Sequence, residues 1–188
     1  MDHPPVVSVY ADESCLGNGR EGDNPGGAGG LIEYQSSGDH EPTRLDFWVS
    51  DPATTNNRMA LRSAIEAFEI LGRKGKRLRV RFTSDSQYLV KGMRDWVPGW
   101  RARGWRRKEG AILNLELWQK AVELAEGHSV EWRWVRGHNE HPQNEYADHL
   151  ATQAARELSS SGGPVPSLYR DWLAAAKAKG KIPETQIR

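Results

Sequence analysis

The order of the apolar stretches along this chain limits the folds that are open to it. Three short strand-like stretches come first, and single strand-like stretches then alternate with helical ones. That order favours a mixed sheet with helices on its faces over a purely parallel, doubly wound sheet. We therefore expect an α/β fold. The expected strands cover residues 6–11, 30–34, 45–49, 78–82 and 130–135.

Helical spacing and loop residues divide the rest of the chain. Helices are expected from Asn56 to Gly72 and over residues 113–125 and 143–158. Residues 17–30 contain seven glycines in no phosphate-binding pattern, and we expect a loop there. The run from Ser159 to Pro164 predicts a flexible break. We thus expect a catalytic domain over 1–158, then a linker and a short helical tail over 159–188.

Composition excludes several classes of protein. The chain has 188 residues, of which 37% are hydrophobic and eight are Trp, enough for the core of one compact domain. A single cysteine excludes a disulfide framework and a Cys-rich zinc site, and it suits the cytosol. No apolar run is long enough to span a bilayer, and the first residues do not resemble a signal peptide. We expect a cytoplasmic protein without a membrane partner.

Three carboxylates occupy positions that favour a metal site. Asp12 and Asp85 lie where expected strands end, and Asp148 lies in the last core helix. Carboxylates gathered at one end of a sheet repel one another unless a cation lies between them. Two Mg²⁺ ions in such a cluster activate water and stabilise the leaving oxygen in phosphodiester hydrolysis. His138, just before the Asp148 helix, is placed to relay a proton. The alternative is that the aspartates are turn and surface residues.

A basic, Trp-rich stretch at residues 91–108 predicts contact with nucleic acid. It contains seven cations and one acid, in a chain whose net charge is +1. Trp96, Trp100 and Trp105 are interleaved with these cations, so that phosphates and sugars or bases could be bound together. The alternative is that the Trp residues anchor a surface helix with solvated cations. The cations are Lys91, Arg94, Arg101, Arg103, Arg106, Arg107 and Lys108.

Five motifs, in order and with similar spacing over residues 6–156, resemble type 1 ribonuclease H. They are DESCLGN at 12–18, TTNNRM at 54–59, TSDSQY at 83–88, WVPGWRARGW at 96–105, and WRWVRGH at 132–138, which leads to Asp148. The resemblance implies a five-stranded mixed sheet and a monomeric, metal-dependent endonuclease. Such an enzyme hydrolyses the RNA strand of RNA–DNA hybrids and leaves 5′-phosphate ends. It implies two Mg²⁺ ions, with Mn²⁺ as the alternative.

The resemblance also assigns roles by position. Asp12, Asp85 and Asp148 would bind metal, and His138 would lie near the leaving group. The side chains expected to contact the backbone or the 2′-hydroxyls are Ser14, Asn18, Thr55, Asn56, Asn57, Gln87 and Asn144. The side chains expected to hold the DNA strand are Trp96, Trp100, Arg101, Arg103 and Trp105.

One departure from the family affects the expected chemistry. The catalytic Glu that normally follows Asn-Arg-Met is Ala60, whereas the Gly that normally follows the first Asp is Glu13. Glu13 could replace the missing metal ligand if the strand bends where it ends. Alternatively, Ala60 is an engineered knock-out and Glu13 is incidental, or the protein is a naturally weak enzyme that binds hybrids. A hybrid-binding module with little hydrolysis is therefore the second functional hypothesis.

The tail after Ser159 is basic. Five cations there, among them Lys179 and Lys181, stand against two acids. With Trp172 and Leu173 as an apolar anchor, the tail could contact nucleic acid or a partner. The alternative is a flexible or self-docked tail.

Overall fold

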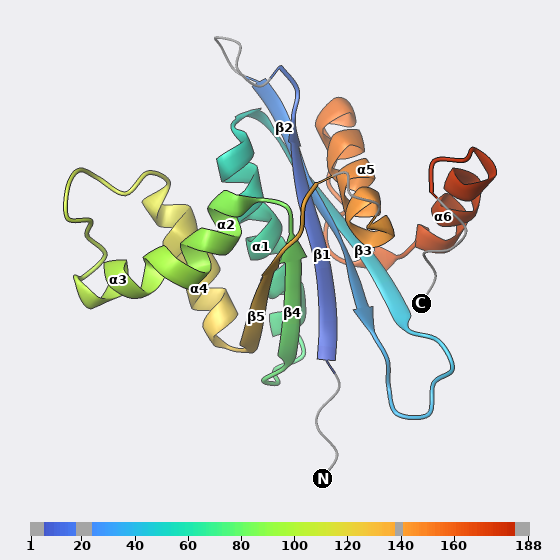
Figure 1. Ribbon diagram of the computed structural model, residues 1–188, viewed down its shortest axis with the longest axis horizontal. Coiled ribbons are helices and arrows are strands. Elements are labelled where there is room, and N and C mark those ends of the chain that lie inside the picture. Colours follow the sequence, from blue (N-terminus) through green and yellow to red (C-terminus); the bar gives the residue numbers. More distant parts are fainter. Residues whose placement is uncertain (1–5, 18–23, 138–140, 183–188) are drawn as a thin grey trace.

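A single mixed sheet runs through the molecule, with helices on both faces (Figure 1). The computed structural model describes residues 6–17, 24–137 and 141–182. The strand order is β5-β4-β1-β2-β3-β6. The strands are β1 Val6–Cys15, β2 Asn24–Tyr34, β3 Thr43–Thr54, β4 Arg79–Ser84, β5 Ser129–Trp134 and β6 Val165–Pro166. The pairs β1–β2, β2–β3 and β3–β6 are antiparallel, whereas β4 runs parallel to both β1 and β5. The α/β expectation is confirmed, but the expected count of five strands is wrong, because β6 adds a short sixth.

Alternation along β1 divides the core between two helical layers. Val7, Val9 and Ala11 are buried in one cluster with residues of α1 and α4. On the opposite face, Tyr10 packs on a second cluster that includes Tyr146 of α5. The helices are α1 Asn56–Gly72, α2 Gln87–Lys91, the π-helical turn η1 Gly92–Trp96, α3 Val97–Ala102, α4 Leu115–Glu126, α5 Pro142–Glu157 and α6 Tyr169–Ala178. In the part of the chain that the structure describes, none of these is long and apolar enough to cross a membrane.

The loop predicted over residues 17–30 is wrong in its second half, where β2 begins at Asn24. Its glycines are packing residues, since a Cβ at Gly27 would lie 2.1 Å from the carbonyl oxygen of Ala151 in α5. At Gly29 the distance to the backbone nitrogen of Ala151 would be 2.8 Å. The lack of side chains at these two positions lets the backbone of α5 approach the sheet closely. These glycines therefore place the helix that carries Asp148.

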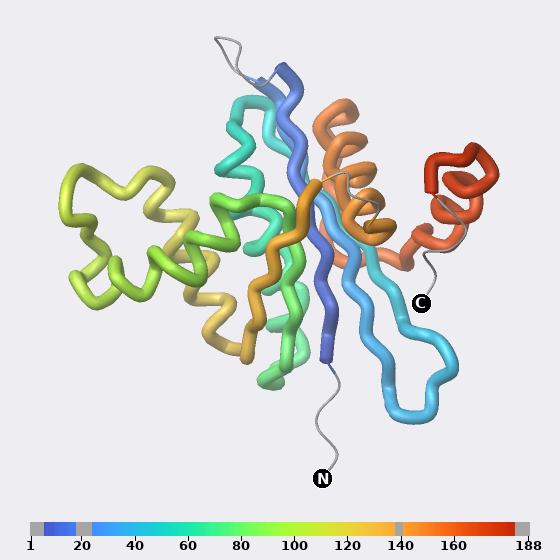
Figure 2. The backbone as a smooth tube through the Cα atoms, in the orientation of Figure 1, coloured from blue at the N-terminus to red at the C-terminus, as the bar shows by residue number. Residues whose placement is uncertain are grey.

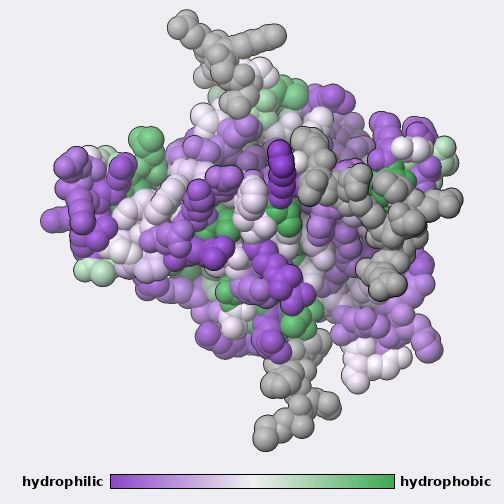
Figure 3. Space-filling view, in the orientation of Figure 1, coloured by the Kyte–Doolittle hydropathy of each residue, from purple (hydrophilic) through white to green (hydrophobic). Residues whose placement is uncertain are grey.

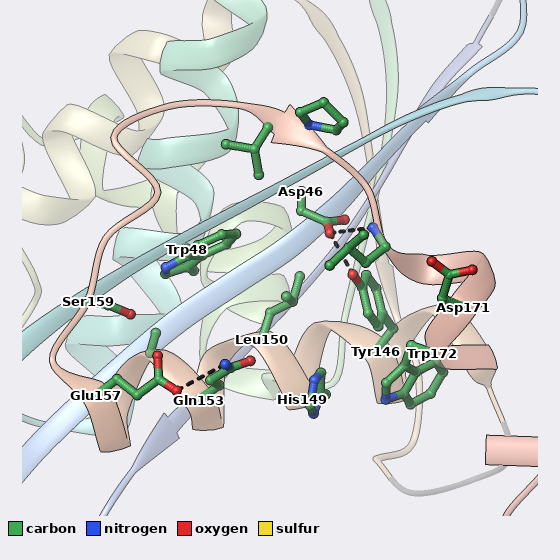
Figure 4. A pocket seen from close by; sticks show the side chains of 14 residues that line it. Asp46, Trp48, Tyr146, His149, Leu150, Gln153, Glu157, Ser159, Asp171 and Trp172 are labelled. Atoms are coloured by element: carbon green, nitrogen blue, oxygen red, sulfur yellow. Dashed lines mark hydrogen bonds between the residues drawn. The ribbon is translucent and has the colours of Figure 1, made fainter. Parts of the chain in front are cut away.

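The C-terminal segment is joined to the sheet by hydrogen bonds. Ser161, within the predicted flexible break, donates its backbone N–H to the carbonyl of Trp48 at 3.0 Å. The buried Asp46 carboxylate accepts the Tyr146 hydroxyl at 2.5 Å and the Leu168 N–H at 3.1 Å (Figure 4). The division into residues 1–158 and 159–188 remains a prediction, which limited proteolysis tests.

The basic stretch forms a protrusion beside the sheet. The tube trace shows α3 and the chain that follows it extending away from β4 and β5 (Figure 2). Hydrophilic residues cover much of this end of the molecule (Figure 3). Its base is fixed by aromatic contacts, because Trp118 of α4 lies 5.5 Å from Trp100 and 5.1 Å from Tyr88 between ring centroids.

Candidate active site

Three carboxylates come together where β1 extends past the end of its neighbour β4. We call this open edge of the sheet, beside Asp12 and Glu13, the notch. The β1–β4 ladder ends at the pair Ala11 and Ser84, so β1 continues past the point where β4 ends. Asp85 follows directly, and Asp12 and Glu13 lie beside the edge that β4 leaves open. Carboxylate oxygens of Asp12, Glu13 and Asp85 all lie within 4.8 Å of one another. The structure therefore gathers two of the three predicted aspartates, together with Glu13.

Burial and repulsion among these three carboxylates favour the binding of protons or of a cation. Burial, and next the charges of Asp85 and Glu13, raise the pKa of Asp12 to about 10. Burial, followed by the charges of Asp85 and Asp148, raises the pKa of Glu13 to about 8. A hydrogen bond from the Glu13 N–H to Asp12 Oδ1, at 2.7 Å, opposes these effects at Asp12. A divalent cation would remove the repulsion among the three groups.

The residues present fit a hard divalent cation. The Glu13 Oε2 atom is buried and has no hydrogen-bond partner, a costly state for a carboxylate oxygen. An all-oxygen, anionic donor set is the kind that Mg²⁺ and Mn²⁺ prefer. Glu13 therefore offers a free lone pair at the place where a cation would reach Asp12 and Asp85.

Asp148 stands next to this cluster without being one of its three members. It lies on α5, half-buried, and its Oδ1 accepts the Thr152 hydroxyl at 3.4 Å. Its charge nevertheless contributes to the raised pKa of both Asp12 and Glu13. Asp148 is thus close enough to act on the site electrostatically.

Backbone contacts that the sequence analysis missed fix the position of Asp85. The Trp134 indole N–H donates to the Asp85 carbonyl at 2.9 Å. A Cβ at Gly137 would lie 2.4 Å from Asp85 Oδ2, so a larger residue there would displace this carboxylate oxygen. Neither contact has a signature in the sequence, since both depend on how β4 and β5 are paired.

Several of the predicted substrate-binding residues carry unused polar atoms. Thr55 caps α1 through a hydrogen bond from the Arg58 N–H to its hydroxyl. The Oδ1 atoms of Asn56 and Asn144 are buried without a partner, as is the hydroxyl of Thr54, which was not predicted. Ser14 is half-buried, whereas Asn57 and Gln87 are exposed. Asn18 and His138 lie outside the described residues.

The protrusion residues divide into exposed and anchoring groups. Trp96 is 37% exposed, whereas Trp100 and Trp105 pack partly buried against the main core. Arg101 forms an ion pair with Glu126, and Arg103 donates to the carbonyl of Arg106. A hollow of about 280 Å³ lies next to them, lined by Tyr88, Trp96, Trp100, Arg107, Ile112, Leu113 and Trp118.

Comparison with known proteins identifies the class. The RNase H family model matches residues 4–156. Ribonuclease H of Halorhodospira halophila is 46% identical over 154 residues, which cover 81% of this chain and 95% of that protein. Ribonuclease HI of Caulobacter vibrioides is 40% identical over 156 residues, which cover 82% and 96%. The chain belongs to the ribonuclease H family, and so to the endoribonucleases.

A solved structure places the chain more closely within the family. The crystal structure of LC9-RNase H1, described as a type 1 RNase H with the type 2 active-site motif, is 59% identical in sequence. It superposes with a TM-score of 0.89 and covers 97% of this chain and 88% of its own. The resemblance to type 1 enzymes is thereby confirmed.

Proposed function

We propose that this chain hydrolyses the RNA strand of RNA–DNA hybrids, with Asp12, Glu13, Asp85 and Asp148 holding divalent cations. One observation carries the proposal: the carboxylates of Asp12, Glu13 and Asp85 converge within 4.8 Å, and Glu13 Oε2 is buried without a partner. A structural ion pair does not explain such a cluster, because within residues 6–17, 24–137 and 141–182 no cationic side chain pairs with Glu13 Oε2.

Glu13 replaces, as a metal ligand, the carboxylate that the family normally has at position 60. Strand alternation puts residue 13 on the same side of β1 as Val9 and Ala11, the side covered by α1. Ala60 belongs to that same buried cluster. A carboxylate at 13 thus approaches the notch from the face that a Glu at 60 would use. LC9-RNase H1, described as a type 1 RNase H with the type 2 active-site motif, is a relative whose active-site motif also departs from type 1, which supports a natural departure over an engineered knock-out.

Each protein group then has a defined task. Bound Mg²⁺ or Mn²⁺ would supply charge neutralisation at the phosphate and lower the pKa of an attacking water. Asp12, Glu13 and Asp85 would hold the cations, and Asp148, on α5, would be the fourth carboxylate of the site. Trp134 and Gly137 keep Asp85 in place. His138 is proposed to move a proton at the leaving oxygen.

The proposed recognition of the hybrid uses two groups of side chains, one for each strand. The amide side chains of Asn56 and Asn144, whose Oδ1 atoms have no hydrogen-bond partner among the described residues, are proposed to bind the 2′-hydroxyls that distinguish RNA. Ser14, Asn18, Thr55, Asn57 and Gln87 are proposed to contact the backbone nearby. The exposed Trp96 and its basic neighbours in the protrusion would hold the DNA strand, because cations neutralise phosphates and an indole packs on a sugar or base.

A cleavage assay separates this function from that of a hybrid-binding module. The wild-type chain is incubated with a hybrid labelled on the RNA strand, with Mg²⁺ or Mn²⁺. Single-stranded RNA, double-stranded RNA and duplex DNA serve as comparison substrates. We expect cleavage of the hybrid RNA alone, and its loss in Asp85→Asn, which controls for a contaminating nuclease. Tight hybrid binding without cleavage would establish the binding module instead. Light scattering in the same buffer tests the expected monomer.

A further inference from the structure

The C-terminal segment packs beside α5, the helix that carries Asp148. α6 lies beyond residues 4–156, which the family model matches, and it packs against α5 (Figure 1). The Trp172 ring lies 5.2 Å from that of Tyr146 and 6.2 Å from that of His149. Tyr169 at the start of α6 and Ile182 after its end are both buried. This segment therefore has a defined position next to the candidate active site.

A groove of about 470 Å³, lined by both charged and apolar side chains, separates α5 from the end of α6. Glu145, Asp148 and Thr152 line it on the α5 side, and Ala175, Lys179 and Lys181 line it on the other. Two ammonium groups thus share a groove with a proposed metal ligand. Among the described residues, neither lysine forms an ion pair with Asp148.

Helix electrostatics account for only part of this arrangement. A lysine in the last turn of a helix is favoured by the negative end of the helix dipole, and Lys177 already fills that place in α6. Lys181 lies past the end of the helix at Ala178, and it still lines the groove. Ala175, on the same side of the groove, has a small side chain and leaves room beside the two lysines.

We infer that this groove receives a backbone phosphate of the RNA strand, next to the phosphate that is cut, and that Lys179 and Lys181 are positioning residues for the hybrid. The inference rests on the proposed function, which places the RNA strand at Asp148. Successive phosphates of a strand advance only about 3.4 Å along the helix axis, so those next to the scissile one must pass close to α5. Carboxylates there repel them, and lysine ammonium groups on flexible stems offset that repulsion.

The test removes the two charges and compares a matched control. Lys179→Gln/Lys181→Gln is measured beside Lys76→Gln/Lys177→Gln, which loses the same charge at an exposed turn and at a position outside the groove. Steady-state cleavage of the hybrid is followed across a range of salt concentrations. For the groove variant we expect a three- to tenfold rise in KM, with kcat within twofold. We also expect the slope of log(kcat/KM) against log salt to flatten by about 1 to 2, as for one or two lost phosphate contacts. The control is expected to match the wild type.

Hybrids with single methylphosphonates identify the strand. A neutral linkage beside the cleavage site in the RNA strand should abolish the difference between wild type and groove variant, whereas one in the DNA strand should leave it intact. The inference is overturned if the groove variant keeps the wild-type KM and salt slope, or if only DNA-strand linkages remove the difference. A fall in melting temperature without a change in salt slope would instead assign the lysines to docking of α6. Absence of cleavage by the wild type would refute the proposed function itself, a separate result.

Discussion

Glu13→Gln is the most informative single substitution, because it removes a charge and keeps the size of the side chain. Glu13 lies within 4.8 Å of both Asp12 and Asp85, measured between carboxylate oxygens. Two unit charges at that distance interact by about 3.5 kcal/mol at an effective dielectric constant of about 20. The attraction between Glu13 and a cation held by the two aspartates is at least of this order. At about 1.4 kcal/mol per factor of ten, we expect divalent cations to bind on the order of 10²-fold more weakly.

Without a cation, Glu13→Gln should stabilise the folded protein, although it weakens the binding of the cation. The folded protein raises the pKa of Glu13 from 4.5 to about 8, so it holds a proton that the unfolded chain has released. Wild-type stability therefore falls as the pH rises from 4.5 to about 8, by up to about 1.4 kcal/mol per pH unit. Gln cannot ionise, so the metal-free variant should become more stable than the wild type across this window.

Calorimetric titration with Mg²⁺ or Mn²⁺, thermal unfolding with and without the cation, and hybrid cleavage together measure both effects. Glu69→Gln is the matched control, since Glu69 is exposed on α1 about two and a half helical turns from Ala60. The reasoning is refuted if Glu13→Gln binds the cation and cleaves the hybrid within threefold of the wild type.

Three further predictions address the position of the site and its surroundings. Ala60→Glu in the Glu13→Gln background should recover part of the lost kcat/KM, whereas equal rates with and without it would contradict the exchange of carboxylates. Gly27→Ala should cost about 3 kcal/mol in urea unfolding, because its Cβ would overlap the backbone of α5. Gly72→Ala, at the end of α1 where a Cβ meets nothing within 4 Å, should be neutral or slightly stabilising, and equal effects would refute this packing argument. Burial lowers the pKa of His128 from 6.5, so the unfolding free energy should fall as the pH drops below about 6.5. His128→Leu should remove this part of the pH dependence, and an unchanged pH profile would exclude His128 as its source.

The order of elements could be read from the sequence, but the end of β1 could not. The strand expected over residues 6–11 continues to Cys15, so Asp12 lies within β1 and not at its end. Asp12 and Asp85 were placed together because both follow buried apolar stretches, and the structure brings them into one cluster. The start of β2 could not be predicted, because glycine is typical of loops and only the approach of α5 explains Gly27 in a strand. The two-residue strand β6 has no periodicity to detect, and it depends on pairing with Leu45 and Asp46.

Whether the Glu13 side chain reaches Asp12 and Asp85 could not be predicted from the sequence either. Strand alternation alone points it away from Asp12, and its contribution depends on where the β1–β4 ladder stops. That register is a property of the paired strands. The same holds for Trp134 and Gly137, which act on Asp85 through a carbonyl group and through close backbone approach.

The glycine-lined contact between β2 and α5 has a consequence for how the protein is made. Asp12, Glu13 and Asp85 are present once less than half of the chain has been synthesised, but Asp148 arrives only with α5. Since α5 closes against a strand from the start of the chain, this contact has a large sequence separation and forms at a high entropic cost. A nascent or truncated chain that ends before α5 would hold three of the four proposed metal-binding carboxylates and lack the fourth. If the proposed site is correct, nuclease activity should thus require the whole domain.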